Sequence, residues 1–197
     1  YQGERCVDAA SIDMAALLAA TQGRPAFSAQ QRAIHQIERL KDAIERSQHR
    51  AGPELRLIRN VDDLRQLMAD RQDGEQVVGA ILGIEGGHWV GNAEGDRQAV
   101  EADMQQLFDL GVRQFAPTHR FDNDLSGSSE GCERYGLTET GKRALQVAER
   151  LGIAVDLAHI SPQGMADAAR LLSEPFMVSH TGVKAVCEPP CLSLIHI

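Results

Sequence analysis

The sequence predicts an α/β fold in which parallel strands alternate with helices, and three observations support this class. Short apolar runs, such as those at 77–84 and 153–158, have the length and composition of strands that are covered on both faces. Segments with the apolar spacing of helices lie between these runs, as in consecutive strand–helix–strand units. Several runs also end at a residue that can bind a metal ion, which is where a β/α barrel places its functional groups.

The N-terminal part of the chain is predicted to be mainly helical. Ser28 is a candidate N-cap for a long helix, and Ile37 lies within an apolar stripe that has helical spacing. Gly52 and Pro53 end this pattern. The expected elements of this part are helices at 11–20 and 28–49, followed by a strand at 54–58.

From there on, helices and strands are predicted to alternate. Leu64, Leu67 and Met68 are expected to face inward from the first of these helices. Thr138 is a candidate N-cap, and Pro162 suits the first turn of a helix. The expected helices are 61–70, 97–110, 138–151 and 162–172, and the expected strands are 77–84, 112–117, 153–158 and 176–179.

The predicted fold is therefore a partial TIM (β/α)8 barrel. Only about five parallel strands are expected, whereas a closed barrel has eight and typically needs roughly 250 residues. At 197 residues the chain is long enough for one sizeable domain, and it shows no internal repeat and no linker that would divide it.

Composition and charge narrow the classes of function. The formal net charge of −8 argues against a nucleic-acid partner, because phosphate binding needs clustered Lys and Arg. No stretch is long and apolar enough to form a transmembrane segment. The cysteines are too few and scattered for a disulfide framework, and Cys187 and Cys191 lack the second pair that a structural zinc site needs. The cellular location stays open.

The residues that point to chemistry stand at the ends of the predicted strands. Each of them alone is compatible with an ordinary hydrogen-bonded loop residue, but their recurrence favours a metal site. One carboxylate with imidazoles is a ligand set typical of catalytic zinc, which lowers the pKa of a bound water to about 7. Two carboxylate oxygens also allow one residue to bridge two metal ions. These residues are Glu85, His119, His159 and His180.

For other residues near the strand ends, a direct role in the metal site is less strongly indicated. Asp156 has the opposite strand parity to His159, so it is expected to support a ligand rather than bind metal itself. His88 follows two glycines, which allow many geometries, and Trp89 is expected either to line a pocket or to cover the barrel rim. The long loop at 119–136 lies on the functional face of a barrel, and its Asx residues favour turns over a calcium site.

Several short motifs resemble those of the membrane (renal) dipeptidase family, whose members are binuclear zinc peptidases of the amidohydrolase-like barrel superfamily. The resemblance covers roughly residues 77–188 and keeps the order and approximate spacing of the motifs. They are Ile84-Glu85-Gly86-Gly87-His88, Thr118-His119, Tyr135-Gly136-Leu137-Thr138-Glu139, Val155-Asp156-Leu157-Ala158-His159 and Ser179-His180-Thr181-Gly182.

The resemblance implies a role for each strand-end residue. Glu85 would bridge two zinc ions, and His159 and His180 would complete the ligands of the second ion. His119 would bind the substrate and polarise its scissile carbonyl. The implied reaction is hydrolysis of a dipeptide by a metal-bound hydroxide, with tolerance of a D-residue at the C-terminal position of the substrate. Family members often form homodimers.

The chain also departs from the family pattern. It has no His-x-Asp pair for the first metal ion, and the position of the carboxylate-binding Arg falls at Cys191. A late Asp that handles protons lies beyond the last residue. We therefore expect 1–190 to be an incomplete dipeptidase barrel domain, 191–197 to be a non-native tail, and this fragment alone to be unstable and inactive.

Two alternative functions stay open from the sequence. One is another hydrolase of the same barrel superfamily, such as an amidase, a lactonase or a deaminase. The other is a non-catalytic barrel that binds a partner, although retention of Glu85, His159 and His180 together favours an enzyme.

Overall fold

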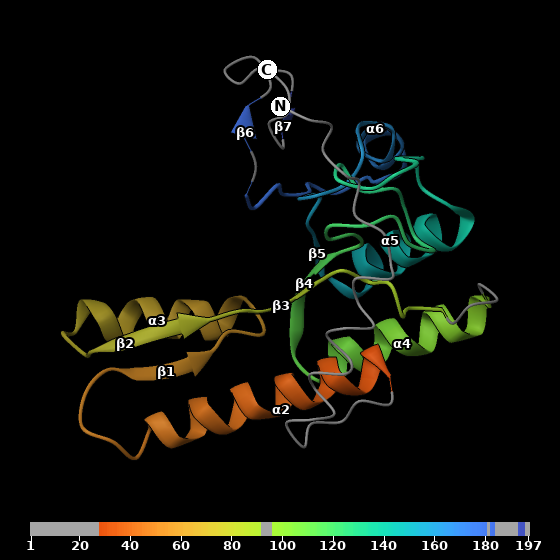
Figure 1. The fold of residues 1–197 in the computed structure, drawn as a ribbon. Coiled ribbons are helices and arrows are strands. Elements are labelled where there is room, and N and C mark those ends of the chain that lie inside the picture. Colours follow the sequence, from red (N-terminus) through yellow and green to blue (C-terminus); the bar gives the residue numbers. More distant parts are fainter. Residues whose placement is uncertain (1–27, 92–95, 181, 184–192, 196–197) are drawn as a thin grey trace, which may run out of the picture.

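Helices and parallel strands alternate along the chain, which confirms the predicted α/β class (Figure 1). The structure is a computed structural model that describes residues 28–91, 96–180, 182–183 and 193–195. The helix predicted at 11–20 lies outside these residues. Every strand pair in the described part is parallel, as the barrel prediction requires.

The first structural unit is a two-stranded sheet with two helices. Strand β1 pairs with β2, while α2 packs against β1 and α3 packs against β2 (Figure 1). These elements are α2 (Ala29–Ser47), β1 (Glu54–Leu57), α3 (Val61–Gln72) and β2 (Val77–Ala80).

The core of this unit is small. Leu67 is buried together with Ile58 and Val77, as the sequence predicts for Leu67. However, Leu64 and Met68 are 44% and 55% exposed, so the prediction that they face inward is wrong. The reason is that two short strands offer α3 only a narrow apolar surface, which Leu67 alone covers.

The main core belongs to a three-stranded sheet in the order β3-β4-β5. Helix α4 packs against β4, α5 packs against β5, and α4 and α6 both contact α5. Phe115, Met104 and Leu145 are fully buried between the sheet and these helices. The elements are β3 (Leu82–Glu85), α4 (Arg97–Asp109), β4 (Val112–Ala116), α5 (Glu139–Leu151), β5 (Ala154–Val155) and α6 (Pro162–Leu171).

The run at 77–84 is divided into two strands, where the sequence predicts one. Its first half pairs with β1 and its second half pairs with β4, and Ile81 between them is 60% exposed. The pairing with β4 also shifts register between Leu82 and Gly83. Because the two halves pair with different neighbours, the run is interrupted at Ile81 instead of forming one strand.

The strand predicted at 176–179 is reduced to a single parallel bridge beside β5. Met177 pairs with Asp156, and its backbone N–H and C=O bond to Val155 and Leu157, each at 2.9 Å. The pairing stops there because the Ser179 N–H donates to the Asp156 carboxylate rather than to a backbone carbonyl. The segment therefore extends the sheet at its edge by only one residue pair.

The helix caps agree with the sequence. Ser28 accepts a hydrogen bond from Gln31 N–H at the start of α2, and Thr138 accepts one from Gly141 N–H at the start of α5. Pro162 lies in the first turn of α6, which Ser161 caps. Near the C-terminal end, β6 (Gly182–Val183) and β7 (Ser193–Ile195) form a separate parallel pair.

Candidate metal centre

The strand-end residues singled out by the sequence meet at the carboxyl edge of the β3-β4-β5 sheet. Glu85 is the last residue of β3, and His119 follows β4 after Pro117 and Thr118. His159 lies just beyond β5, and His180 ends the segment that pairs beside β5. Parallel strands place their carboxyl ends on one edge, so residues distant in sequence converge there.

Three potential ligand atoms lie close together in this cluster. Glu85 Oε1 is 3.2 Å from His159 Nε2 and 3.1 Å from His180 Nε2, and these two nitrogens are 2.8 Å apart. Tetrahedral zinc with bonds of about 2.0–2.1 Å separates its ligands by roughly 3.3 Å, so this triangle suits such an ion. Side chains of Glu85, His159 and His180 are 43%, 12% and 56% exposed, which leaves room for a substrate.

His119 stands beside these three side chains rather than among them. Its Nε2 is 3.9 Å from Glu85 Oε2, and its ring meets the His159 ring edge-on with centroids 4.7 Å apart. Ligand atoms of Glu85, His119 and His159 also lie within 4.8 Å of one another. The shorter distances to His180 favour Glu85, His159 and His180 as the ligand set, with His119 at its border.

His159 is held by a carboxylate on the side away from the cluster. Its Nδ1 lies 3.3 Å from Glu130 Oε1, and the other oxygen of Glu130 accepts from Arg120 Nε at 2.9 Å. A carboxylate beside Nδ1 favours a proton on that nitrogen, which would leave His159 Nε2 free to bind a metal ion.

The environment of His159 also favours its neutral form. Burial, together with the positive charge of His119, lowers the pKa of His159, and the carboxylates of Glu85 and Glu130 offset only part of this shift. A neutral imidazole binds metal, whereas a protonated one does not.

Asp156 lies near the cluster but bonds elsewhere, as the strand parity predicts. One carboxylate oxygen accepts from Ala158 N–H and Ser179 N–H, each at 3.0 Å, and the other accepts from Gln114 Nε2 at 2.6 Å. Burial raises the pKa of Asp156. These hydrogen bonds and that of the Ser179 hydroxyl lower the pKa by more than burial raises it, so the net change is a decrease. Asp156, Glu85 and His180 together border a hollow of about 240 Å³.

The loop at 119–136 folds back onto the site through its Asx residues. Asp122 accepts hydrogen bonds from Ser128 N–H and Glu133 N–H, and Asn123 accepts from Leu125 N–H. The Asn123 contact is an Asx turn, as predicted, whereas Asp122 ties together more distant parts of the loop. The loop then pairs with the segment after β5, where Ser129 N–H donates to His159 C=O at 2.8 Å. This pairing brings Glu130 to His159.

The backbone of His159 is left-handed, with φ of 64°. This conformation is unfavourable for residues other than glycine and occurs often at functional sites. Here it points the imidazole at Glu85 while the carbonyl of His159 bonds to the loop.

His88 and Trp89 are packed rather than aimed at the cluster. The His88 ring contacts Phe121 with centroids 5.3 Å apart, and Trp89 packs against the main core. Burial, with the charges of Arg32 and His119, lowers the pKa of His88. Of the two interpretations of Trp89, the structure favours the covering role.

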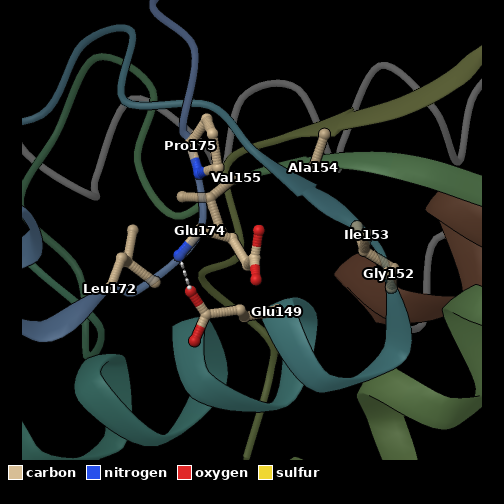
Figure 2. A pocket seen from close by; sticks show the side chains of 8 residues that line it. All are labelled: Glu149, Gly152, Ile153, Ala154, Val155, Leu172, Glu174 and Pro175. Atoms are coloured by element: carbon tan, nitrogen blue, oxygen red, sulfur yellow. Dashed lines mark hydrogen bonds between the residues drawn. The ribbon is translucent and has the colours of Figure 1, made fainter.

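A larger hollow, of about 400 Å³, lies near the opposite end of β5 (Figure 2). Two carboxylates, Glu149 and Glu174, line it, and Glu149 Oε1 accepts from Ser173 N–H and Glu174 N–H at 2.8 and 2.7 Å. Both backbone groups lie in the turn after α6, so Glu149 has a structural role. The hollow is therefore not the preferred site.

The family model of the membrane dipeptidases, peptidase family M19, matches residues 10–191. The chain belongs to this family. Among solved structures it is similar to a dipeptidase that is a metallopeptidase of family M19, with 25% identity and a TM-score of 0.59, over 84% of this chain and 43% of that one.

Two further solved structures resemble this membrane dipeptidase family member. A metallopeptidase from Rhodobacter sphaeroides, liganded with a phosphinate mimic of the dipeptide L-Ala-D-Ala, is 26% identical with a TM-score of 0.53, over 77% and 39% of the two chains. An amidohydrolase from Pseudomonas aeruginosa, 19% identical with a TM-score of 0.58 over 75% and 40%, shares the fold. The chain thus spans about two fifths of the length of these structures.

Sequence reasoning about this dipeptidase family member missed two residues that contact the candidate ligands. Glu130 contacts His159, and Ser179 contacts His180. Only their positions, one in the long loop and one directly before a strand-end histidine, hinted at the site. No helix among the described residues is long and apolar enough to cross a membrane.

Proposed function

We propose that this chain carries the zinc-binding part of an enzyme that hydrolyses dipeptides. The observation that supports it most is the meeting of Glu85 Oε1, His159 Nε2 and His180 Nε2 within 3.2 Å of one another. One carboxylate and two imidazoles are ligands that zinc accepts, and an exposed face leaves a position open. Membership of the membrane dipeptidase family supports the same reaction.

The side chains divide the work of peptide hydrolysis. Zinc bound by Glu85, His159 and His180 would supply a water acidic enough to act as a nucleophile at neutral pH. Glu85 keeps its second oxygen, Oε2, on the side of His119, where a second ion can share the carboxylate. His119, with a 42% exposed side chain, donates a hydrogen bond to the carbonyl oxygen as negative charge develops there.

The proposed substrate is a dipeptide, and a D-residue at its C-terminal position is tolerated. The similar Rhodobacter sphaeroides structure with a mimic of L-Ala-D-Ala supports this choice. Homodimer formation is a further expectation from the family resemblance, and sedimentation of the purified protein tests it.

Residues 1–197 alone are proposed to be inactive. The chain covers only 39% to 43% of the metallopeptidases that it resembles, and a site for the first metal ion needs further ligands. Measurable dipeptide turnover by the soluble, folded 197-residue chain would contradict this proposal.

The test uses the full-length protein, stripped of metal and reconstituted with zinc, with L-Ala-D-Ala and L-Ala-L-Ala as substrates. We expect turnover that depends on zinc and falls by at least about 100-fold in Glu85→Gln and His180→Ala. His49→Ala, at an exposed position after α2, is the matched control and keeps full activity. Absence of turnover in the zinc-loaded wild type, or full activity in His180→Ala, would overturn the proposal.

A further inference from the structure

The hydroxyl of Ser179 lies between a carboxylate and a candidate metal ligand. Ser179 Oγ is 2.5 Å from Asp156 Oδ2 and 2.8 Å from His180 Nδ1. A serine hydroxyl has one proton to donate, so it donates to one of these neighbours and accepts from the other. The direction of this donation decides which nitrogen of His180 carries a proton.

The surroundings of Asp156 determine the direction. Asp156 is 2% exposed and receives hydrogen bonds from two backbone N–H groups and from Gln114 Nε2. Such a set of donors holds the carboxylate in its ionised form, which only accepts. Ser179 therefore donates to Asp156, and its oxygen accepts from His180 Nδ1–H. The lone pair of His180 Nε2 is then directed toward Glu85 Oε1 and His159 Nε2, an arrangement that a cation between these atoms would stabilise.

We propose that Asp156 and Ser179 are positioning residues that fix the tautomer of His180. Through them, His180 presents the lone pair of Nε2 to the metal ion at Glu85. This inference rests on the proposed function, because the tautomer of His180 matters only if His180 binds a metal ion. It assigns a role to Ser179, which is not one of the candidate metal ligands.

The same two residues also hold the segment that carries His180. Ser179 bonds to Asp156 through its backbone N–H as well as its hydroxyl, at the point where the pairing beside β5 ends. A test must therefore separate tautomer control from simple docking of this segment.

The substitution Asp156→Asn makes this separation. Two backbone N–H groups point at Oδ1, so the amide oxygen stays there and the NH₂ group takes the place of Oδ2. Because Gln114 Nε2 also donates to Oδ2, the Gln114 amide must rotate so that its Oε1 accepts from the new NH₂. The NH₂ also donates to Ser179 Oγ, which must then give its own proton to His180 Nδ1. His180 is forced to protonate Nε2, the nitrogen that faces Glu85. Docking is preserved, but the tautomer is reversed.

The experiment measures zinc affinity of the full-length protein by competition with a chromophoric chelator, without any activity assay. We expect Asp156→Asn to weaken zinc binding about 10- to 100-fold. Adding Ser179→Ala to Asp156→Asn removes the misdirected donor and is expected to restore at least a part of the affinity. Ser179→Thr keeps the hydroxyl and keeps wild-type affinity.

A second readout follows the tautomer itself. With zinc bound, the ¹⁵N-detected Nδ1–H of His180 should be protected from exchange by Ser179 Oγ in the wild type and should lose this protection in Asp156→Asn. The zinc-loaded protein is used because, without an ion, His180 Nε2 faces two acceptors, Glu85 Oε1 and His159 Nε2. Asp167→Asn is the matched control, because Asp167 also accepts from a backbone N–H, that of Leu137, away from the site. It leaves both readouts unchanged.

Two outcomes separate this inference from the proposed function. If the wild type binds zinc but Asp156→Asn binds it equally well, tautomer control is wrong and the metal site stands. If the double variant binds zinc no better than Asp156→Asn, the pair only docks the segment and the inference is overturned. If the wild type binds no zinc, the proposed function fails, and this inference, which rests on it, fails with it.

Discussion

Glu130 restrains the imidazole of His159 more directly than any other side chain of the long loop. The contact places a carboxylate behind a candidate ligand, and Arg120 holds that carboxylate from the far side. The carboxylate is thus placed where the outer partners of metal-binding histidines lie, beside the ring nitrogen that does not face the metal. Glu130 is therefore as important to test as the ligands themselves.

Replacing Glu130 should weaken metal binding without unfolding the protein. In Glu130→Gln the amide oxygen faces the Arg120 donor, so the NH₂ group meets His159 Nδ1 and disfavours the ligating tautomer. We expect zinc affinity of the full-length protein to fall about 10- to 100-fold, measured by chelator competition. Glu139→Gln, at an exposed carboxylate of α5, is the control. Equal affinities for the two variants would contradict the role of Glu130.

His88 gives a pH dependence to the stability of the metal-free protein. Because burial lowers its pKa in the folded state, the unfolded chain binds more protons once the pH falls through the unfolded value of about 6.5. Stability from this group is fully present above that pH and declines below it. Urea midpoints at pH 7.5 and 5.5 should therefore differ less in His88→Leu than in the wild type. An unchanged difference would exclude His88 as a source.

At the scale of elements, Thr138 joins the long loop to α5. Its hydroxyl caps the helix at Gly141 N–H and also donates toward the carbonyls of Asp124 and Leu125. One side chain thus ends the loop and begins the helix that covers β5.

We expect Thr138→Ala to reduce the free energy of unfolding by about 1 kcal/mol, a typical value for a lost N-cap. Thr138→Ser keeps the hydroxyl and should lose much less. Urea denaturation of both variants measures the difference, and equal losses would show that the methyl group rather than the cap matters.

The sequence predicts that the candidate ligands meet, because the strand ends can be located from local patterns. A short apolar run followed by a turn indicates where a strand ends, and parallel strands end on the same edge. Glu85 and His159 could be brought to one edge in this way. The interruption at Ile81 could not be predicted, because it depends on which strands pair with each half of the run. The contact of Glu130 could not either, since it requires the long loop to fold back.

At the scale of the whole molecule, several large apolar side chains remain exposed on the sheet and its edge. Val78 and Ile81 are 44% and 60% exposed, and Phe176 and Met177 are 37% and 41% exposed. Apolar groups gathered near strand edges favour association between molecules.

The 197-residue chain is therefore expected to associate as its concentration rises. Ile81→Lys should reduce this association, because it places a charge at the exposed position between β2 and β3 without removing a buried contact. Light scattering over a concentration series measures the effect, with Val61→Lys at the exposed start of α3 as the control. An equal reduction of association in both variants would show that the added charge, and not its position at Ile81, is responsible.

The left-handed backbone of His159 makes backbone stability and the imidazole side chain conflicting requirements at this position. Glycine would relieve a conformation that costs an L-residue roughly 1–2 kcal/mol, so a selection for thermal tolerance alone would favour it there. The same exchange would remove an imidazole from the cluster around Glu85. Under the proposed function, histidine at 159 exchanges backbone stability for metal binding, and efforts to stabilise the protein should leave it untouched.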